Sequence, residues 1–276
     1  MGTRLAVTLA GRSASDRMPQ PLNEGLAEIG ARVDAAKRVA VLLDFDGTLA
    51  EIAATPELAQ MKPGMRAALL SLRHEHDVVV AIVSGRALED VRERVGIPEL
   101  IYAGCHGLVI RGPGLDFLQP QAQRAVPALK RLAEQLAPRL RHIAGVLVED
   151  KVLGISVHFR QVAARDRQEV ALAVQTIAGR SDWKFRVRRG REVWEISPTV
   201  DWDKGRAVRW ILARAAGRDA LPIFIGDDVT DEDAFVALPE GITIRVGQAA
   251  ESSAAWSVAG PEEVGTFLLW LGSRLR

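Results

Sequence analysis

Two aspartates, Asp44 and Asp46, stand directly after the apolar run Val39–Leu43 and before Gly47. A strand buried on both faces would deliver them to the carboxyl edge of an open α/β sheet, where ligands bind. They would point to opposite faces in a continuing strand, but Gly47 permits a sharp turn that brings both to one site. Close carboxylates repel each other unless a cation such as Mg²⁺ relieves them. One is then available as a nucleophile and the other as an acid and base. The alternative is an Asp-Gly turn.

A second group of acids follows another apolar run, Pro222–Ile225. It holds five carboxylates in the seven residues 227–233, which favours a hard-cation site at the same edge of the sheet. Asp227 and Asp228 precede the next helix, so we expect them to be metal ligands. We interpret Asp231 to Asp233 as acids of the first helical turn that complement the helix dipole. A solvated run of charge is the alternative.

Two further polar groups stand at the starts of predicted helices. Ser84, Gly85 and Arg86 follow the apolar run Val78–Val83, and a hydroxyl with backbone N–H groups suits a phosphoryl oxygen. Lys204 stands in the first turn of a helix, where a cation is poorly placed unless an anion lies nearby. The alternatives are a plain N-cap for Ser84 and a solvated side chain for Lys204.

The elements that carry these groups alternate between apolar strands and amphipathic helices, which predicts an α/β fold with a doubly wound, mainly parallel, Rossmann-like core. Between residues 108 and 197 the pattern changes to strand pairs joined by short turns, which is typical of an antiparallel sheet with helices on one side. We therefore expect a core domain of residues 39–107 and 198–276 and an inserted α/β cap of residues 108–197. Residues 1–38 form an N-terminal extension, with a tail at 1–20 and a helix at 22–37.

Composition limits the function. The 36 basic and 35 acidic residues among 276 leave a charge of +1, which argues against a nucleic-acid or acidic-membrane surface and favours a small-molecule partner. The single cysteine, Cys105, excludes an internal disulfide, and no Cys/His cluster has zinc spacing. We find neither a signal core nor a membrane helix. We expect a cytoplasmic monomer, with association through the helix at 22–37 left open.

Together the motifs resemble those of the haloacid dehalogenase superfamily: Asp-x-Asp-Gly-Thr at Asp44, then Ser84, Lys204 and the second acidic cluster, in that order. The resemblance implies that Asp44 attacks phosphorus to form an aspartyl-phosphate, while Asp46 protonates the leaving alcohol and then activates water. It also implies that Ser84 and Lys204 hold phosphoryl oxygens. Asp44, the Asp46 carbonyl and Asp227 would bind Mg²⁺, and the metal and Lys204 would neutralise developing charge.

Residues 39–247 resemble the trehalose-6-phosphate phosphatases within that superfamily. The similar segments are Glu149-Asp150-Lys151, His158-Phe159-Arg160 and Glu195-Ile196-Ser197-Pro198, together with Val83–Arg86, 104–107 and 226–233. The resemblance implies hydrolysis of trehalose 6-phosphate in trehalose biosynthesis. Alternating charges on cap strands suit a disaccharide, whose hydroxyls need fixed donors and acceptors. The expected substrate contacts are Gly85, Arg86, His106, Glu149, Lys151, His158, Arg160 and Glu195. The chain departs from the family at Cys105, where we expect Asn or Glu.

Three alternatives are weighed against this interpretation. The first is a phosphatase of another sugar phosphate, such as sucrose phosphate or a mannosyl phosphate. A phospho-acceptor receiver domain also carries an aspartate on a doubly wound sheet, but it needs neither an inserted cap nor a second carboxylate such as Asp46. A degenerate binding protein is disfavoured because every motif residue needed for turnover is present.

Overall fold

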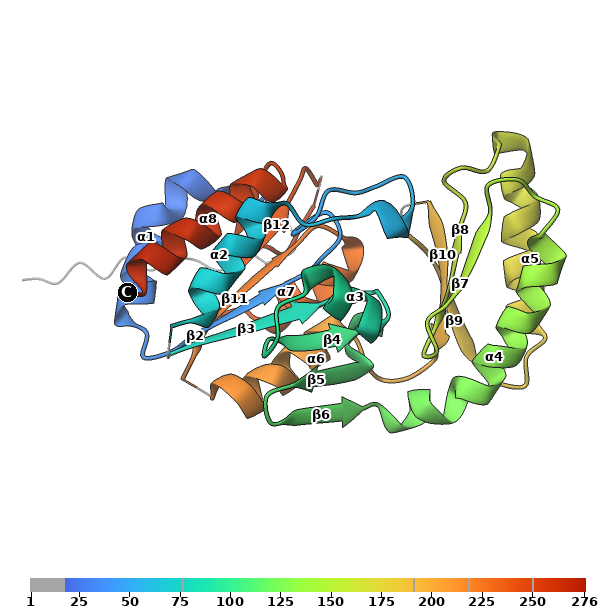
Figure 1. The fold of residues 1–276 in the computed structure, drawn as a ribbon, viewed down its shortest axis with the longest axis horizontal. Coiled ribbons are helices and arrows are strands. Elements are labelled where there is room, and N and C mark those ends of the chain that lie inside the picture. The colour runs from blue at the N-terminus through green and yellow to red at the C-terminus, as the bar shows by residue number, and fades with distance from the viewer. Residues whose placement is uncertain (1–17, 76, 191, 218, 250) are drawn as a thin grey trace, which may run out of the picture.

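The computed structural model describes residues 18–276 except positions 76, 191, 218 and 250. The described chain forms a nine-stranded sheet and a four-stranded sheet (Figure 1). Most of the expected N-terminal tail, residues 1–17, lies outside the described residues, and so does Arg191 in the predicted cap. Within the described part of the chain, no helix combines the length and the apolar character that crossing a bilayer would require.

The larger sheet has the order β1-β13-β12-β11-β2-β3-β4-β5-β6. All neighbours from β1 to β4 in this order are parallel, and β5 and β6 add an antiparallel edge. The carboxyl ends of β2, β3 and β11 therefore meet at one edge, as the sequence predicts. The bounds are β1 Gln20–Pro21, β2 Val39–Leu43, β3 Val78–Val83, β4 Ile101–Gly104, β5 Val109–Gly112, β6 Leu115–Leu118, β11 Leu221–Gly226, β12 Ile242–Val246 and β13 Trp256–Val258.

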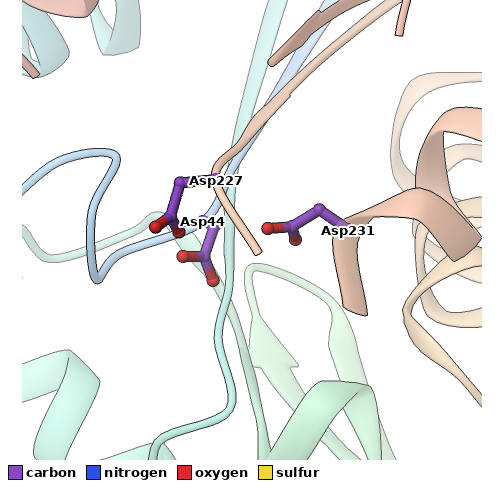
Figure 2. A group of neighbouring side chains, drawn as sticks. All are labelled: Asp44, Asp227 and Asp231. Carbon is purple, nitrogen blue, oxygen red and sulfur yellow. The ribbon is translucent and has the colours of Figure 1, made fainter. Parts of the chain in front are cut away.

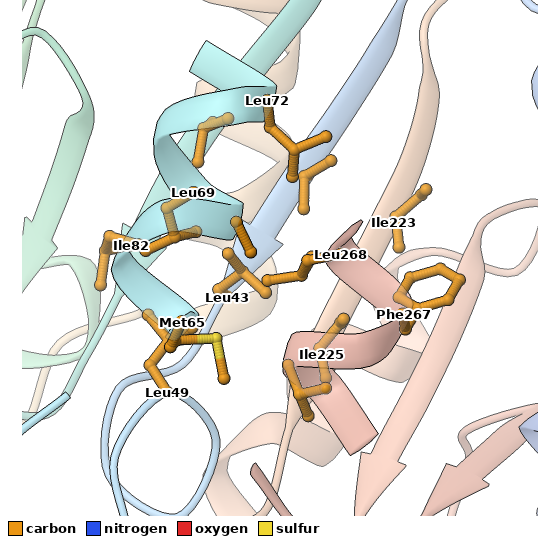
Figure 3. Close-up of a cluster of buried hydrophobic side chains, with 14 of the residues drawn as sticks. Leu43, Leu49, Met65, Leu69, Leu72, Ile82, Ile223, Ile225, Phe267 and Leu268 are labelled. Carbon is orange, nitrogen blue, oxygen red and sulfur yellow. The ribbon is translucent and has the colours of Figure 1, made fainter. Parts of the chain in front are cut away.

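Helices cover both faces of this sheet. The central strand β2 is apolar at every position, so the side chains on each of its faces must be buried. Val41 and Leu43 join one core cluster, part of which is shown in Figure 3, whereas Ala40 and Leu42 join the cluster on the other face. The first face is covered by α1 Leu22–Ala35, α2 Pro63–Arg73, α3 Leu88–Val95 and α8 Pro261–Arg274. The second face is covered by α6 Lys204–Ile211 and α7 Glu232–Ala237. This arrangement confirms the doubly wound α/β fold.

The smaller sheet is antiparallel, with the order β7-β8-β10-β9. Two helices pack on one of its faces around a separate apolar cluster that includes Leu129, Leu136 and Val157. Its opposite face is turned toward the larger sheet (Figure 1). The bounds are β7 Leu147–Asp150, β8 Ile155–His158, β9 Phe185–Gly190, β10 Val193–Pro198, α4 Pro120–Leu140 and α5 Arg167–Gly179.

The hairpin of β5 and β6 lies at the expected start of the cap, residue 108. A tight turn at residues 113–114 joins β5 to β6, and β5 pairs with β4 and so extends the larger sheet. Hairpin geometry is local, whereas the choice of sheet depends on which edge strand is free to pair, and β4 offers that edge. We therefore propose that the cap begins at about Pro120 and ends at Pro198.

Several boundaries also differ from the expected ones. The helix expected at residues 22–37 is α1, which ends at Ala35, and α4 runs from Pro120 to Leu140 with Pro127 and Pro138 inside it. Strand β1 pairs with β13, so Gln20 belongs to the sheet and not to a tail. The strand β13 had no counterpart among the expected elements, because three residues are too few to show a periodic pattern.

Candidate active site

The ends of β2 and β11 bring two carboxylates together. Asp44 follows β2, and its main-chain N–H donates to the Ile225 carbonyl of β11 at 2.9 Å. Asp227 follows β11, and the turn after Asp46 passes beside it. Gly47 in that turn has φ +76°, and a Cβ there would lie 2.1 Å from Asp227 Oδ2. Only glycine therefore allows this backbone to approach the second carboxylate.

Lys204 joins two carboxylates at the centre of the site. Its Nζ donates to Asp44 Oδ1 at 2.8 Å and to Asp231 Oδ1 at 2.7 Å. Lys204 begins α6, where the side chain of Asp203 caps the helix by accepting from the Arg206 N–H. The lysine is only 2% exposed, so its charge must be compensated by the two buried carboxylates. A lysine in the first turn of a helix led us to expect an anion nearby, and the carboxylates of Asp44 and Asp231 are the anions found there.

The cluster holds three carboxyl groups and one ammonium group. Burial raises the pKa of Asp44 well above its usual value, against the effect of Lys204. Burial and the charges of Asp231 and Asp228 raise the pKa of Asp227 to about 7. Although burial lowers the pKa of Lys204, Asp231 and Asp44 raise it above its usual value, so the ammonium form persists. One cation thus faces three carboxylates, which favours binding of a further cation.

Figure 2 shows these three carboxylates, whose ligand atoms all lie within 4.8 Å of one another: Asp44, Asp227 and Asp231. Asp228 accepts from the Asp231 N–H and from the Thr230 hydroxyl, and so caps the turn, while its role as a metal ligand stays a prediction. Asp231, expected only to complement a helix dipole, is fully buried. The glycine at position 226 was the sequence feature that could have indicated the burial of Asp231 against β11, because a Cβ there would lie 2.3 Å from the Asp231 carboxyl carbon.

Asp46 does not join this cluster through its side chain. Its two oxygens accept from one guanidinium, Arg86 Nε at 2.7 Å and Arg86 Nη2 at 2.6 Å. Arg86 also donates to Asp90 on α3, and its expected contact with substrate stays a prediction. The i, i+4 spacing of Arg86 and Asp90 was the sequence feature from which this ion pair could have been predicted.

Ser84 and His106 meet at the ends of β3 and β4. Ser84 is 1% exposed, and its Oγ accepts from the Arg86 N–H at 3.2 Å, which leaves its hydroxyl proton available to a ligand. Its carbonyl accepts from the His106 N–H at 2.9 Å. A Cβ on Gly85 would lie 2.6 Å from the His106 ring, so the ring packs directly on glycine. Burial raises the pKa of the adjacent Cys105 thiol to about 12, which keeps that thiol neutral.

Two cap side chains reach this part of the core. Lys151 Nζ donates to the Gly85 carbonyl at 3.0 Å, and Glu195 Oε2 lies 3.2 Å from His106 Nε2. Lys151 and Glu195 form an ion pair, with 3.9 Å between Lys151 Nζ and Glu195 Oε1. Burial raises the pKa of Glu195, but His106 and Lys151 together hold it well below its usual range. Glu195 is therefore an ionised acceptor inside the cleft.

The remaining predicted cap residues lie on β7 and β8 or just beyond. Glu149 Oε2 and His158 Nε2 are 3.0 Å apart. Although burial raises the pKa of Glu149, the hydrogen bond with His158 and the charge of Lys151 bring it below its usual value. Arg160 donates to the Ala53 carbonyl in the core loop between β2 and α2. Both sheets therefore contribute charged groups to the space between them.

One cavity between the sheets is lined by every predicted site residue except Ser84, among the residues that the structure describes. The loop 52–56 also lines it, and sequence reasoning missed this segment because it carries no charged motif. The predicted residues on its wall are Asp44, Asp46, Gly85, Arg86, His106, Glu149, Lys151, His158, Arg160, Glu195, Lys204, Asp227 and Asp228.

Comparison with known proteins identifies a family with this site. The sequence model of the trehalose-phosphatase family matches residues 42–261. The trehalose-phosphate phosphatase of Mycobacterium marinum is 41% identical over 273 residues, covering 95% of this chain and 69% of the relative. That of Mycobacterium avium is 46% identical over 217 residues, covering 77% of this chain and 54% of the relative.

Solved structures show the same fold. The C-terminal domain of the Candida albicans trehalose-6-phosphate phosphatase aligns with a TM-score of 0.79 at 19% identity, covering 94% of this chain and 99% of that one. A trehalose-6-phosphate phosphatase related protein aligns with a TM-score of 0.74 at 24% identity, covering 85% and 97%. From the family match and the extent of sequence identity, we conclude that this chain belongs to the trehalose-phosphatase family.

Proposed function

We propose that this protein hydrolyses trehalose 6-phosphate to trehalose and phosphate in trehalose biosynthesis, in two magnesium-dependent steps on Asp44. As a member of its family it is a phosphoric monoester hydrolase. The observation that carries the proposal is the buried hydrogen bond from Lys204 to Asp44, on the wall of a cavity lined by charged cap residues.

In the first step, an Asp44 carboxylate oxygen attacks phosphorus while the bond from phosphorus to the sugar oxygen breaks. Asp46 gives its proton to that departing oxygen, so trehalose leaves as a neutral alcohol. Lys204 supports this step because its ammonium orients Asp44 and can neutralise charge on the phosphoryl oxygens. Ser84, with its free hydroxyl proton, is the second group that we expect on those oxygens.

In the second step, Asp46 removes a proton from water, and the resulting hydroxide attacks phosphorus. The bond between phosphorus and Asp44 then breaks, which releases phosphate and restores the Asp44 carboxylate. Asp46 regains its proton in this step and is ready for the next turnover. A covalent route through a carboxylate divides one difficult displacement into two easier ones.

The acidic cluster fits a hard divalent cation. Its donors are carboxylate oxygens, its three carboxyl groups outnumber the single ammonium group, and the turn at Gly47 brings the end of β2 close to Asp227. We propose that Asp44, Asp227 and the Asp46 carbonyl would hold Mg²⁺. Asp231 is committed to Lys204 and to the Asp228 N–H, so we assign it to positioning of the lysine. Bound Mg²⁺ would polarise the phosphoryl group and offset its charge.

The cap supplies the groups for sugar recognition. Glu149, Lys151, His158, Arg160 and Glu195 line the cavity opposite Asp44, and we propose that they bind trehalose hydroxyls. Their present partners within the protein are hydrogen-bonding groups that a sugar can replace. A cytoplasmic location and a monomeric state, expected from the sequence, also stand as proposals.

A substrate panel with metal control tests the function. Phosphate release from trehalose 6-phosphate should exceed release from sucrose 6-phosphate, mannose 6-phosphate and glucose 6-phosphate at least about tenfold in kcat/KM. EDTA should stop release, and added Mg²⁺ should restore it. Equal rates across the panel would overturn the substrate assignment, and full activity after metal removal would overturn the magnesium assignment. A sucrose or mannose phosphate at the top of the panel would favour the alternative sugar-phosphate phosphatase.

A further inference from the structure

Arg86 holds the carboxylate of Asp46 in a fork. The two hydrogen bonds of 2.7 and 2.6 Å come from different nitrogens and reach different oxygens. Such paired bonds fix both the position and the plane of the carboxylate. The Arg86 side chain is 7% exposed, whereas that of Asp46 is 41% exposed and borders the cavity. The buried partner is therefore in a position to determine how the exposed one is oriented.

The guanidinium is itself fixed by other parts of the core. Arg86 Nη1 donates to Asp90 Oδ2 at 2.7 Å, and Nη2 donates to the Pro56 carbonyl at 2.9 Å. The guanidinium also lies 5.2 Å from the centre of the Phe45 ring. Although burial lowers the pKa of Arg86, the hydrogen bonds with Asp46 and Asp90 raise it above its usual value. Arg86 thus has little freedom to follow a moving substrate.

A second layer supports this arrangement. Asp90 Oδ1 accepts from Arg94 Nε at 2.8 Å, so the two oxygens of Asp90 hold two arginines. Arg94 Nη1 in turn donates to the Glu57 carbonyl at 3.1 Å and the Ala59 carbonyl at 3.0 Å. Helix α3 therefore fixes the loop 51–61 through hydrogen bonds to its main chain. Residues of this loop line the cavity, and its Ala53 carbonyl accepts a hydrogen bond from the cap residue Arg160.

We propose that Arg86 is the positioning residue for Asp46, and that Asp90 holds Arg86 in place for this purpose. The proposal rests on the proposed function, in which Asp46 transfers protons to the sugar oxygen and from water. Each Asp46 oxygen accepts one bond from Arg86 and keeps a lone pair for a second partner, so the fork orients the carboxylate without blocking it. Proton transfer needs heavy atoms within hydrogen-bond reach, which a freely rotating side chain would satisfy only part of the time.

The proposal predicts a loss that depends on the leaving group. Trehalose leaves as an alcohol and needs a proton, whereas 4-nitrophenolate leaves readily without one. Arg86→Lys keeps the charge but cannot form the fork. Asp90→Asn weakens the support of Arg86 and touches neither Asp46 nor the cavity wall. Arg92→Lys is the matched control, since Arg92 is on the same helix but pairs with Glu89 on the exposed surface.

The experiment measures first-turnover product release by rapid quench, with enzyme in excess and Mg²⁺ present, and kcat and KM for trehalose 6-phosphate at steady state. Arg86→Lys and Asp90→Asn should each slow trehalose release at least about tenfold, and slow 4-nitrophenolate release less than about threefold, with little change in the KM for trehalose 6-phosphate. The control should match wild type on both substrates. A raised KM at unchanged kcat would show that Arg86 binds substrate, and equal losses on both substrates would show a structural role. Either result overturns the proposal.

A double-mutant cycle separates this proposal from the function on which it rests. If Arg86 acts through Asp46, then Arg86→Lys should have no further effect on trehalose release in an Asp46→Asn background. Additive losses would overturn the positioning role. If wild type fails on trehalose 6-phosphate, or Asp46→Asn shows no leaving-group dependence, the proposed function fails instead. Thermal melts check folding, and should Arg86→Lys not fold, Asp90→Asn decides the question alone.

Discussion

Lys151 of the cap donates a hydrogen bond of 3.0 Å to the main-chain carbonyl of Gly85 in the core. Gly85 lies between Ser84, which we propose to bind phosphate, and Arg86, which holds Asp46, so the contact joins the proposed sugar site to the proposed catalytic site. Lys151 also lies 3.9 Å from Glu195, which approaches His106 of the core. We therefore propose that sugar recognition by the cap is linked to its closure over the core.

Removal of a cap group should therefore affect sugar substrates selectively. We expect Lys151→Ala or Glu195→Ala to lower kcat/KM for trehalose 6-phosphate at least about tenfold, or about 1.4 kcal/mol of transition-state stabilisation. Hydrolysis of 4-nitrophenyl phosphate should change much less, because it lacks the sugar. Lys184→Ala, at an exposed position of the cap, is the matched control. Equal losses on the two substrates in folded variants would contradict a sugar-binding role.

Asp44→Asn should abolish turnover and leave the fold intact. An amide keeps the volume of the carboxylate and can still meet Lys204, but it is not a nucleophile. We expect steady-state phosphate release to fall by more than about a thousandfold. Circular dichroism and a thermal melt provide the folding control. Appreciable turnover by a homogeneous preparation would exclude the aspartyl-phosphate route.

Lys204→Met should reduce both activity and stability. The substitution leaves Asp44 and Asp231 buried without their shared donor, and breaking a buried pair in this way costs about 3–5 kcal/mol. Urea unfolding measures the stability, and Arg206→Met, at a half-exposed position of the same helix, is the control. A double variant, Lys204→Met with Asp231→Asn, should recover part of the lost stability but no activity. If the single variant is as stable as wild type, the three charges are not coupled as the structure indicates.

Magnesium should stabilise the folded protein independently of turnover. Binding to the native state alone raises the melting temperature with rising metal concentration. We expect this shift in wild type and in the inactive Asp46→Asn variant, whose metal-binding carbonyl is retained, and its loss in Asp227→Asn. Ca²⁺ and Zn²⁺ serve as comparison ions in the same melts. A melting temperature unaffected by Mg²⁺ in wild type would remove the metal from this cluster.

The metal-free protein should lose stability as pH rises through about 7. Burial and the charges of Asp231 and Asp228 raise the folded-state pKa of Asp227 to about 7, above the unfolded value of about 3.9. The folded state therefore binds the additional proton, and this contribution is full below pH 4 and lost as pH rises through 7.

The difference between wild type and Asp227→Asn isolates this effect. In EDTA, the variant should gain stability over wild type by more than about 1 kcal/mol between pH 5 and pH 8, as measured by urea unfolding. Asp182→Asn, which alters an exposed carboxylate of the cap, should show no such change. A difference that stays constant with pH would contradict the raised pKa of Asp227.

The fold class and the family were predicted from sequence because their signals are local. Val39–Leu43 is apolar at every position, which predicts a strand buried on both faces, and the structure has β2 at those residues. The acids after this strand and after Pro222–Ile225 predict one edge, since parallel strands place their carboxyl ends together. Gly47 predicted the turn beside Asp227, because glycine adopts a backbone with φ of +76° without steric cost.

Tertiary packing decided the partners of the charged groups. Lys204 and Asp44 are 160 residues apart in sequence, and Arg86 and Asp46 are 40 apart, so no periodicity could pair them. The same limit explains why the sequence predicts Asp231 only as an acid of the first helical turn, whereas the structure buries it beside Lys204. A residue's type and spacing define what it can donate or accept. Which group it meets depends on how the strands and helices pack, because burial leaves each charge only the partners within hydrogen-bond reach.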